Sequence, residues 1–320
     1  VNSVRLRLWN DPYTEDGVPY GAGTNDLEVY KKLAKRAMDH GMSILLDYHY
    51  SDFWADPGKQ RVPKAWRGMD VDQLEQAVYD YTRVTLLEMK AAGVFPQLVQ
   101  VGNELTNGLM WPLGQKPEYD NIAKFVSAGI RAVRSVDSDI PVMIHLDNGG
   151  NNPMYVDWFD NYMERGEDFD IIGMSYYPFW HGTMKELEAN MRDMADRYGK
   201  KIVIAEVSMG FTMDDYAEYE KLGPDYRKGY ATKPSLVEKL DYPMTPEGQA
   251  EFMNDIMKLI DDVPGGDGFY YWEAGWIPVP GSGWATEGAL SYIEESGPCG
   301  NEWANQALFD YDGHALPALK

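Results

Sequence analysis

Residues 43–49 have the sequence Ser-Ile-Leu-Leu-Asp-Tyr-His, a short apolar run that ends in polar side chains. The segment before this run carries apolar residues at helical spacing: Leu27, Tyr30, Leu33, Ala34, Ala37 and Met38. Asp26 is a suitable N-cap for that helix, and Gly41 is a suitable C-terminal cap. A helix that leads directly into a short buried strand is typical of a parallel sheet covered by helices.

The same unit recurs along the whole chain. Apolar, β-rich runs occupy residues 4–9, 43–49, 97–104, 141–147, 170–176, 201–206 and 268–272. The segments between them have helical periodicity, as in residues 72–92 and 246–260, and no linker or low-complexity tract interrupts the alternation. The pattern predicts an α/β fold, a (β/α)8 TIM barrel, with residues 1–320 as a single barrel domain.

The number of predicted strands is one short of a closed barrel. Seven runs are visible where eight are needed, and the chain opens on a strand at Val4, so the first βα unit is predicted to be missing from this chain. An open doubly wound sheet is the alternative. Such a sheet normally has a glycine-rich turn after its first strand, and none follows Trp9.

The composition narrows the class of partner. The 51 acidic and 29 basic residues give a formal charge of -22, which repels phosphate backbones and anionic membrane surfaces, so neither nucleic acid nor a membrane is expected as a partner. A neutral substrate fits this charge better than a polyanion. Tryptophan (10) and tyrosine (22) are frequent enough that some rings are expected to face a ligand. Cys299, the single cysteine, predicts neither a disulfide nor a metal site.

Polar residues gather where the predicted strands end. Catalytic groups of (β/α)8 barrels project from the carboxyl ends of the strands, so these residues are expected to form one rim. They are Arg7, Trp9, Asp47, His49, Asp52, Asn103, Glu104, His145, Asp147, Asn148, Ser175, Tyr176, Tyr177, Glu206, Trp272 and Glu273.

Two glutamates stand out within this set. Val-Gly-Asn-Glu at 101–104 and Ile-Ala-Glu-Val at 204–207 each place a carboxyl group at the end of an apolar strand, which is a costly position for an idle charge. A retaining glycosidase needs two such groups about 5 Å apart, one protonated and one ionised. Glu104 and Glu206 are therefore catalytic candidates, and a structural ion pair is the alternative.

Longer segments carry a resemblance to a known family. They are Val4–Trp9 (VRLRLW), Leu46–Pro57 (LDYHYSDFWADP), Tyr271–Glu273 (YWE) and Asn305–Asp310 (NQALFD). Asn103-Glu104 with Glu206 resembles the clan of retaining (β/α)8 glycosidases, and the four segments together resemble the arabinogalactan endo-β-1,4-galactanases, glycoside hydrolase family 53. The family's first strand has no counterpart here.

The resemblance implies a reaction and roles. The expected reaction is endo-hydrolysis of β-1,4-galactosidic bonds in the (arabino)galactan side chains of pectin, by an extracellular or cell-envelope enzyme, although no signal segment is present. Glu104 corresponds to the acid/base, Glu206 to the nucleophile, Asn103 to a ligand of the sugar 2-hydroxyl and Arg7 to a group that orients the nucleophile. Some bacterial members hold calcium through a His and an Asn in the seventh loop. No His occurs between Ser208 and Asp267, so no cofactor is predicted and calcium is left as the alternative.

The remaining candidates have both functional and structural interpretations. Tyr176 is expected either to donate to Glu206 or to pack in the core, and His49 and His145 either line a subsite or are structural hydrogen-bonders. A metal site at Asp47, His49 and Asp52 matches no ligand motif. Trp272 is the best candidate for a floor under the cleaved sugar.

Other tryptophans and a long last loop suggest the shape of the site. Trp9 and Trp54 are expected to extend the aromatic floor along a groove. The Gly-Ser-Gly-Trp segment at 281–284 suggests an open cleft that binds an internal stretch of polymer. Two alternatives remain: an endo-glycosidase of the same clan that acts on mannan or glucan, and a non-catalytic galactan-binding protein on a degenerate barrel.

Overall fold

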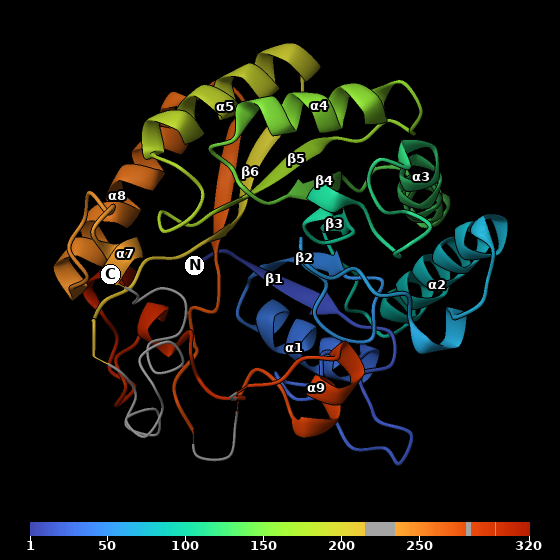
Figure 1. Ribbon diagram of the computed structural model, residues 1–320, viewed down its shortest axis with the longest axis horizontal. Coiled ribbons are helices and arrows are strands. Elements are labelled where there is room, and N and C mark those ends of the chain that lie inside the picture. The colour runs from blue at the N-terminus through green and yellow to red at the C-terminus, as the bar shows by residue number, and fades with distance from the viewer. Residues whose placement is uncertain (215–233, 280–282, 298) are drawn as a thin grey trace.

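A curled parallel sheet of seven strands forms the centre of the molecule (Figure 1). The computed structural model describes residues 1–214, 234–279, 283–297 and 299–320. The strands pair in chain order: β1 (Ser3–Leu8), β2 (Ser43–Tyr48), β3 (Leu98–Val101), β4 (Val142–Leu146), β5 (Ile171–Tyr176), β6 (Lys201–Val207) and β7 (Gly266–Tyr271). All seven predicted strands are confirmed, and the arrangement is that of a (β/α)8 barrel.

Helices lie between the strands and cover the outer face of the sheet (Figure 1). The α-helices are α1 (Leu27–Asp39), α2 (Val71–Ala91), α3 (Tyr119–Val136), α4 (Asn152–Met163), α5 (Met184–Tyr198), α7 (Pro234–Val237), α8 (Pro246–Asp262) and α9 (Glu287–Ile293). Short 3₁₀ turns are η1 (Lys64–Trp66), η2 (Leu105–Asn107), η4 (Ala304–Gln306) and η5 (Pro317–Leu319). None of the described helices combines the length and apolar character that crossing a membrane requires.

The helix ends follow the predicted capping chemistry. The Asp26 side chain accepts from the Val29 backbone N–H and begins α1, and the Thr245 side chain accepts from Gly248 N–H with Pro246 at the first position of α8. Gly41 follows α1 with a φ of 73°, a left-handed conformation that glycine adopts without strain.

The interior of the barrel has an apolar floor and a polar layer above it. The floor consists of buried side chains on β2, β4, β5 and β6: Leu45, Met143, Ile171, Val203 and Ala205. Side chains further along the strands make the polar layer: Arg5, Asp47, Gln100, His145, Ser175 and Glu206. Because every strand is parallel, these polar groups meet at one end of the barrel.

A register shift in β6 turns Glu206 toward the interior. Met174 pairs with Ile204, but the next residue of β5, Ser175, pairs with Glu206, so Ala205 is an extra residue. Ile202 and Ile204 belong to the core under the helices. Simple alternation would send Glu206 to the same outer face, and the bulge instead lets it face the barrel axis.

The two edge strands of the described sheet are β1 and β7. The Ser3 Oγ and Tyr270 hydroxyl oxygens lie 2.9 Å apart and join these strands through side chains. Within the described residues no strand pairs with β1 on this side. The position of the eighth barrel strand, between β7 and β1, is therefore the one that the strand count predicted to be missing.

Candidate active site

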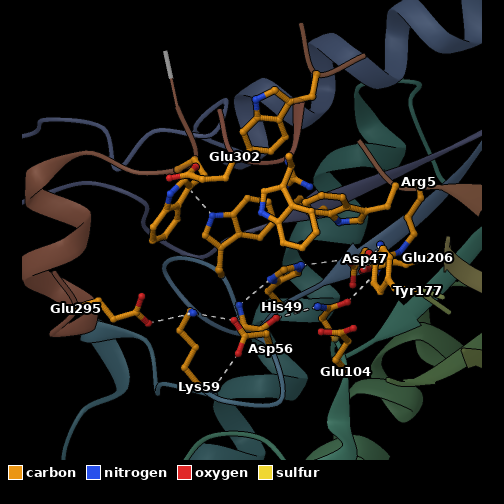
Figure 2. Close-up of a pocket in the computed structure, with 18 of the residues that line it drawn as sticks. Arg5, Asp47, His49, Asp56, Lys59, Glu104, Tyr177, Glu206, Glu295 and Glu302 are labelled. Carbon is orange, nitrogen blue, oxygen red and sulfur yellow. Dashed lines mark hydrogen bonds and ion pairs between the residues drawn. The ribbon is translucent and has the colours of Figure 1, made fainter. Parts of the chain in front are cut away.

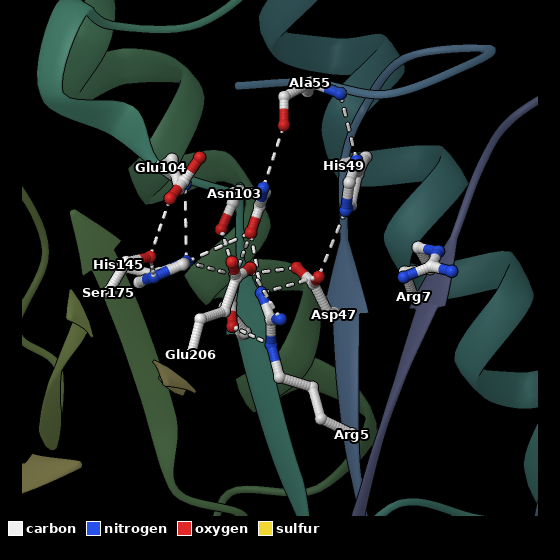
Figure 3. A network of polar contacts seen from close by, with 12 residues as sticks. Arg5, Arg7, Asp47, His49, Ala55, Asn103, Glu104, His145, Ser175 and Glu206 are labelled. Carbon is white, nitrogen blue, oxygen red and sulfur yellow. Dashed lines mark hydrogen bonds and ion pairs between the residues drawn. The ribbon is translucent and has the colours of Figure 1, made fainter. Parts of the chain in front are cut away.

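Glu104 and Glu206 lie side by side at the carboxyl end of the barrel (Figure 3). One carboxyl oxygen of each glutamate and a ring nitrogen of His145 all fall within 4.8 Å of one another, and both glutamates are less than a tenth exposed. Glu206 comes from β6 itself. Glu104 lies three residues beyond the end of β3 at Val101, so the prediction that it is the last residue of the strand is wrong.

A tight turn after β3 positions Glu104. Gly102 has a φ of 82°, and a Cβ there would lie 2.7 Å from the Leu105 side chain. Glu104 itself has a φ of 49°, in the left-handed region that a non-glycine residue rarely adopts. Strain of this kind is typical of functional sites, because it fixes the direction of one side chain.

The surroundings of Glu104 favour its protonated form. Burial raises the pKa of Glu104 well above its usual range, and the negative charges of Glu206 and Asp147 add to this effect. The Ser175 hydroxyl donates to Glu104 Oε1 over 2.6 Å, and this hydrogen bond lowers the pKa of Glu104. Ser175 Oγ in turn lies 2.9 Å from His145 Nε2. A buried, protonated carboxyl group is suited to act as a general acid.

Two donors hold the carboxylate of Glu206. Arg5 Nη1 donates to Glu206 Oε1 over 2.8 Å, and the Tyr177 hydroxyl donates to Oε2 over 2.6 Å. Both oxygens of the carboxylate are therefore held by strong donors. The two carboxyl groups thus have opposite environments, which is the arrangement expected of an acid and a nucleophile.

Arg5 connects Glu206 to the other polar groups of the layer (Figure 3). Its Nη2 lies 2.8 Å from Asp47 Oδ2 and donates to Asn103 Oδ1 over 2.6 Å. The Asn103 amide nitrogen donates to the Ala55 backbone oxygen, which fixes the orientation of the amide. Asp47 also accepts from His49 Nε2 over 3.1 Å.

A cleft of about 650 Å³ opens above the two glutamates (Figure 2). Five tryptophans and Tyr177 contribute much of its wall: Trp54, Trp272, Trp276, Trp284 and Trp303 are the tryptophans. At the end of the cleft away from the glutamates, Lys59 lies between Asp56 and Glu295, with nitrogen–oxygen distances of 2.8 Å and 3.2 Å (Figure 2). Such a cleft, aromatic with a few charged groups, suits the apolar faces and hydroxyls of sugar rings.

Comparison with known proteins identifies the family. The model of glycosyl hydrolase family 53 matches residues 1–320. This chain belongs to that family. It is 38% identical over 339 residues to an endo-β-1,4-galactanase of Bacillus subtilis (strain 168), covering 100% of this chain and 76% of that protein. It is 35% identical over 285 residues to arabinogalactan endo-β-1,4-galactanase A of Aspergillus niger, covering 87% and 75%.

Solved structures agree with this assignment. The GH53 catalytic domain of Ignisphaera aggregans superposes with a TM-score of 0.89 at 39% identity, covering 100% of this chain and 84% of that chain. A GH10 endoxylanase from a sugarcane soil metagenome has a TM-score of 0.58 at 17% identity, covering 99% and 86%, and shares the fold alone. The predicted resemblance to family 53 is confirmed.

Two roles assigned from sequence belong to neighbouring residues. The prediction that Arg7 orients the nucleophile is wrong, because Arg5 makes that contact. Arg7 lies nearer the rim, where its Nη1 is 2.7 Å from Glu273 Oε1 and its guanidinium lies 4.2 Å from the centre of the Trp54 ring. Both arginines are on the same face of β1, and only the deeper one reaches Glu206.

The prediction that Tyr176 donates to Glu206 is also wrong. The Tyr176 hydroxyl donates to the Gly182 backbone oxygen over 3.1 Å, and its ring stacks on Phe252 of α8. Successive residues of a strand point to opposite faces, so Tyr176 faces the helices and Tyr177 faces the barrel axis. The structural interpretation of Tyr176, packing in the core, is the correct one.

The other predicted residues divide between the cleft and its support. Those that line the cleft are Arg7, Asp47, His49, Trp54, Asn103, Glu104, Glu206 and Trp272. Those that do not line it are Trp9, Asp52, His145, Asp147, Asn148 and Tyr176. For the first group, contact with substrate stays a prediction.

The residues outside the cleft hold its parts in place. Trp9 is fully buried, and its Nε1 donates to His49 Nδ1 over 3.2 Å. Asp52 accepts from the backbone N–H groups of Asp11 and Lys64 and so anchors the loop after β2. A prediction of direct sugar contact is wrong for these two, because packing and loop hydrogen bonds occupy them.

Three further candidates lie on β4 or directly after it. His145 is fully buried, and burial followed by the charge of Arg5 lowers its pKa well below the usual range. Burial raises the pKa of Asp147 to about 6, although the Thr106 hydroxyl bonds to its carboxylate. Asn148 has a φ of 59° in the turn before α4. The hydrogen bonds of His145 and the charge of Asp147 predict an effect of these two residues on Glu104. Contact of Asn148 with sugar stays a prediction.

Several residues of the cleft were given no specific role in the sequence-based prediction, although Tyr177 was among those expected on the rim. Arg5 lies two residues from Arg7, and Tyr177 lies next to Tyr176, the two residues to which the sequence assigned these contacts. The motifs therefore marked the right segments, but they did not show which residue of each segment contacts Glu206. Lys59, Glu295 and Trp303 come from loops far from any strand end. No pattern in the sequence marks such loop residues.

The donor set that could hold a metal coincides with the two glutamates. Among the His, Cys, Asp and Glu side chains of the described residues, Glu104, His145 and Glu206 form a group that could bind one ion together, with one ligand atom each within 4.8 Å of the others. Each of them already has hydrogen-bond partners within the polar layer. The absence of a cofactor stays a prediction, and residues 215–233 of the segment between Ser208 and Asp267 lie outside the described residues.

Proposed function

We propose that this protein hydrolyses internal β-1,4-galactosidic bonds of galactan and retains the configuration at the anomeric carbon. The observation that carries the proposal is the pair of buried carboxyl groups, of which one oxygen each lies within 4.8 Å of the other. Retaining glycosidases have carboxyl groups about 5 Å apart, whereas inverting enzymes separate them by about 6.5–9.5 Å to admit a water molecule. The galactanase names of the relatives support the choice of substrate.

In the first step Glu104 gives its proton to the oxygen of the leaving sugar while a Glu206 oxygen attacks the anomeric carbon. The glycosidic bond breaks, and an ester forms between the sugar and Glu206. Glu104 is suited to the donor role because its pKa is raised by burial and by nearby negative charge. Arg5 and Tyr177 hold both oxygens of Glu206 in place for the attack.

In the second step Glu104, now ionised, removes a proton from water. The water oxygen attacks the anomeric carbon, the ester bond to Glu206 breaks, and Glu104 regains its proton. Two inversions at one carbon give net retention. Asn103 lines the cleft next to Glu104, and Arg5 fixes its amide oxygen, which leaves the amide in a defined position relative to the sugar.

The aromatic wall accounts for binding of a neutral polymer. Trp272 lies between other rings of the wall, 4.8 Å from Trp303 and 6.4 Å from Trp54 between ring centres. A flat ring of this kind stacks on the apolar face of galactose, and several of them in one cleft allow several sugar units to bind. An internal stretch of the polymer is the expected ligand.

Release of reducing ends from β-1,4-galactan, mannan and cellulose tests the substrate. Cleavage of galactan with little action on the other two is expected, and activity on mannan or cellulose alone would refute the choice. The first product observed by proton NMR should carry the β configuration. Glu104→Gln and Glu206→Gln should each lower kcat by at least about 1000-fold if these side chains are acid/base and nucleophile.

Both catalytic groups are side chains of the chain itself, so we propose that turnover requires no metal ion. Dialysis against EDTA should leave kcat unchanged, and a loss restored by one cation would contradict this. Because galactan is a polymer of the plant cell wall, we also propose that the protein acts outside the cell. Activity in the medium rather than in the cell lysate is the expected outcome.

A further inference from the structure

Gln100 is buried within the polar layer and does not line the cleft. It lies on β3, its side chain is fully inaccessible to solvent, and neither the sequence pattern nor the proposed mechanism assigns it a role. Burying an amide without partners is costly, so the contacts of Gln100 indicate what it does.

Two charged neighbours fix which way the amide of Gln100 points. Arg5 Nε can only donate, and it lies 2.9 Å from Gln100 Oε1. The Asp47 carboxylate can only accept, and its Oδ1 lies 2.7 Å from Gln100 Nε2. The oxygen therefore faces Arg5, which holds Glu206, and the nitrogen faces the opposite side of the layer.

On that opposite side the nitrogen of Gln100 approaches His145. Gln100 Nε2 lies 3.1 Å from His145 Nδ1, and the backbone N–H of Glu104 points at the same ring nitrogen over 3.4 Å. The second hydrogen of this amide is shared between Nδ1 and the Gly102 backbone oxygen, which is 2.9 Å away. Two donors thus converge on Nδ1.

One acceptor also lies near His145 Nδ1. Asn103 Oδ1 is 3.0 Å from it, but that oxygen already accepts from Arg5 over 2.6 Å and approaches Gln100 Nε2 at 3.2 Å. The short bond from Arg5 occupies one lone pair of this oxygen, whereas the Glu104 N–H and a Gln100 hydrogen both point at Nδ1. Because the lowered pKa of His145 keeps the ring neutral, the ring carries one proton, and the donors around Nδ1 place that proton on Nε2.

The proton on Nε2 sets the direction of the bonds that reach Glu104. His145 Nε2 donates to Ser175 Oγ, and the Ser175 hydroxyl then donates to Glu104 Oε1. Oε1 is thereby kept as an acceptor, and the transferable proton of Glu104 is left on Oε2. With the proton on Nδ1 instead, the chain would reverse, and Glu104 Oε1–H would donate inward to Ser175.

We infer that Gln100 is a positioning residue that fixes the tautomer of His145 and, through Ser175, keeps the proton of Glu104 on the oxygen available to the leaving group. By the same amide it holds Arg5 against Glu206, so one side chain aligns both halves of the catalytic pair. This inference rests on the proposed function, since it assigns an effect on proton donation.

The variant Gln100→Glu separates the two contacts. Its Oε1 still accepts from Arg5, so Glu206 stays held, and when protonated its second oxygen can donate to Asp47. Only the hydrogen that faces His145 and Gly102 is lost. Gln249→Glu is the matched control, because Gln249 is equally buried and its amide nitrogen donates to the Met209 and Ala307 backbone oxygens, away from the glutamates.

Aryl β-galactobiosides with different leaving groups provide the readout. A 2,4-dinitrophenolate leaves without help from an acid, whereas phenol needs a proton from Glu104. For Gln100→Glu we expect kcat/KM to fall by about 10- to 100-fold with the phenyl substrate, which is part of the usual contribution of a general acid. With the dinitrophenyl substrate kcat/KM should be nearly unchanged, and Gln249→Glu should show no dependence on the leaving group.

Equal losses with both substrates, or no loss at all, would overturn the inference. A second measurement needs no variant: ¹⁵N NMR of the histidine rings of the wild-type protein should show His145 protonated on Nε2, and protonation on Nδ1 would also overturn it. If the wild-type protein cleaves neither galactan nor the aryl galactobiosides, the proposed function fails, and the NMR result still decides the tautomer.

Discussion

Tyr176 and Tyr177 are adjacent residues with opposite environments, and this pair offers a sharp test of the site. Tyr177→Phe removes the hydroxyl that donates to Glu206 Oε2 over 2.6 Å, while Tyr176→Phe removes one that donates to a backbone oxygen over 3.1 Å. The two substitutions delete the same atom from neighbouring positions of one strand end. Their difference therefore reports the direction in which each ring points.

The magnitudes follow from the type of hydrogen bond. A bond to a charged group contributes about 1.5–3 kcal/mol, and at about 1.4 kcal/mol per factor of ten this corresponds to a loss of about 10- to 100-fold in kcat/KM for Tyr177→Phe. The neutral bond of Tyr176 contributes about 1 kcal/mol to the free energy of unfolding and nothing to catalysis. Tyr176→Phe should lower the melting temperature by about 1 to 3 °C at unchanged kcat/KM.

Initial rates on galactan and calorimetric melting of both variants measure these quantities. Melting of Tyr177→Phe close to that of the wild type would assign its loss of rate to the Glu206 contact. If Tyr176→Phe loses as much activity as Tyr177→Phe, or if Tyr177→Phe retains full activity, the assignment of Tyr177 to the nucleophile is refuted.

Three further predictions concern the charged groups of the site. Arg5→Lys should lower kcat on galactan by about 100-fold, because a lysine ammonium cannot replace the several hydrogen bonds of the planar guanidinium. Arg7→Lys should affect mainly KM. Equal effects of the two variants on kcat would contradict the separate roles. The rate should fall as pH rises through the raised pKa of Glu104, which must be protonated to act as acid. Asp147→Asn removes one charge that raises this pKa, so the fall in the pH profile of kcat/KM should move to lower pH, and an unmoved profile would exclude the coupling. Asp52→Ala should lower the free energy of unfolding by about 2–4 kcal/mol in a denaturant titration, because the backbone N–H groups of Asp11 and Lys64 lose their charged acceptor. A large rise in KM without loss of stability would instead support the contact of Asp52 with sugar that the sequence predicted.

The order of strands and helices could be predicted because it depends on local chemistry. Apolar runs of strand length, helical spacing and residues such as Asp26 and Thr245 at helix starts follow from the properties of neighbouring residues. The two glutamates could be chosen for a similar reason. A carboxyl group beside an apolar strand is costly to bury, and parallel strands bring all such groups to one end.

The faces of the strands could not be predicted in the same way. Strands of a covered parallel sheet are buried on both sides, so they lack the alternation of polar and apolar residues that would tell Tyr176 from Tyr177. Arg5 and Arg7 share a face, and the choice between them depends on depth in the barrel and on the reach of the side chain. Loop residues such as Lys59 and Glu295 meet only when the chain is folded.

The sequence by itself determined that this chain is a (β/α)8 protein of family 53 with Glu104 and Glu206 as its candidate catalytic pair. Only the tertiary structure decided how that pair is held. A bulge at Ala205 turns Glu206 inward against the period of its strand, and Gln100 joins residues that are distant in the chain. Periodicity is a property of neighbours in sequence, whereas register, depth and the sharing of hydrogen bonds are properties of strands packed together.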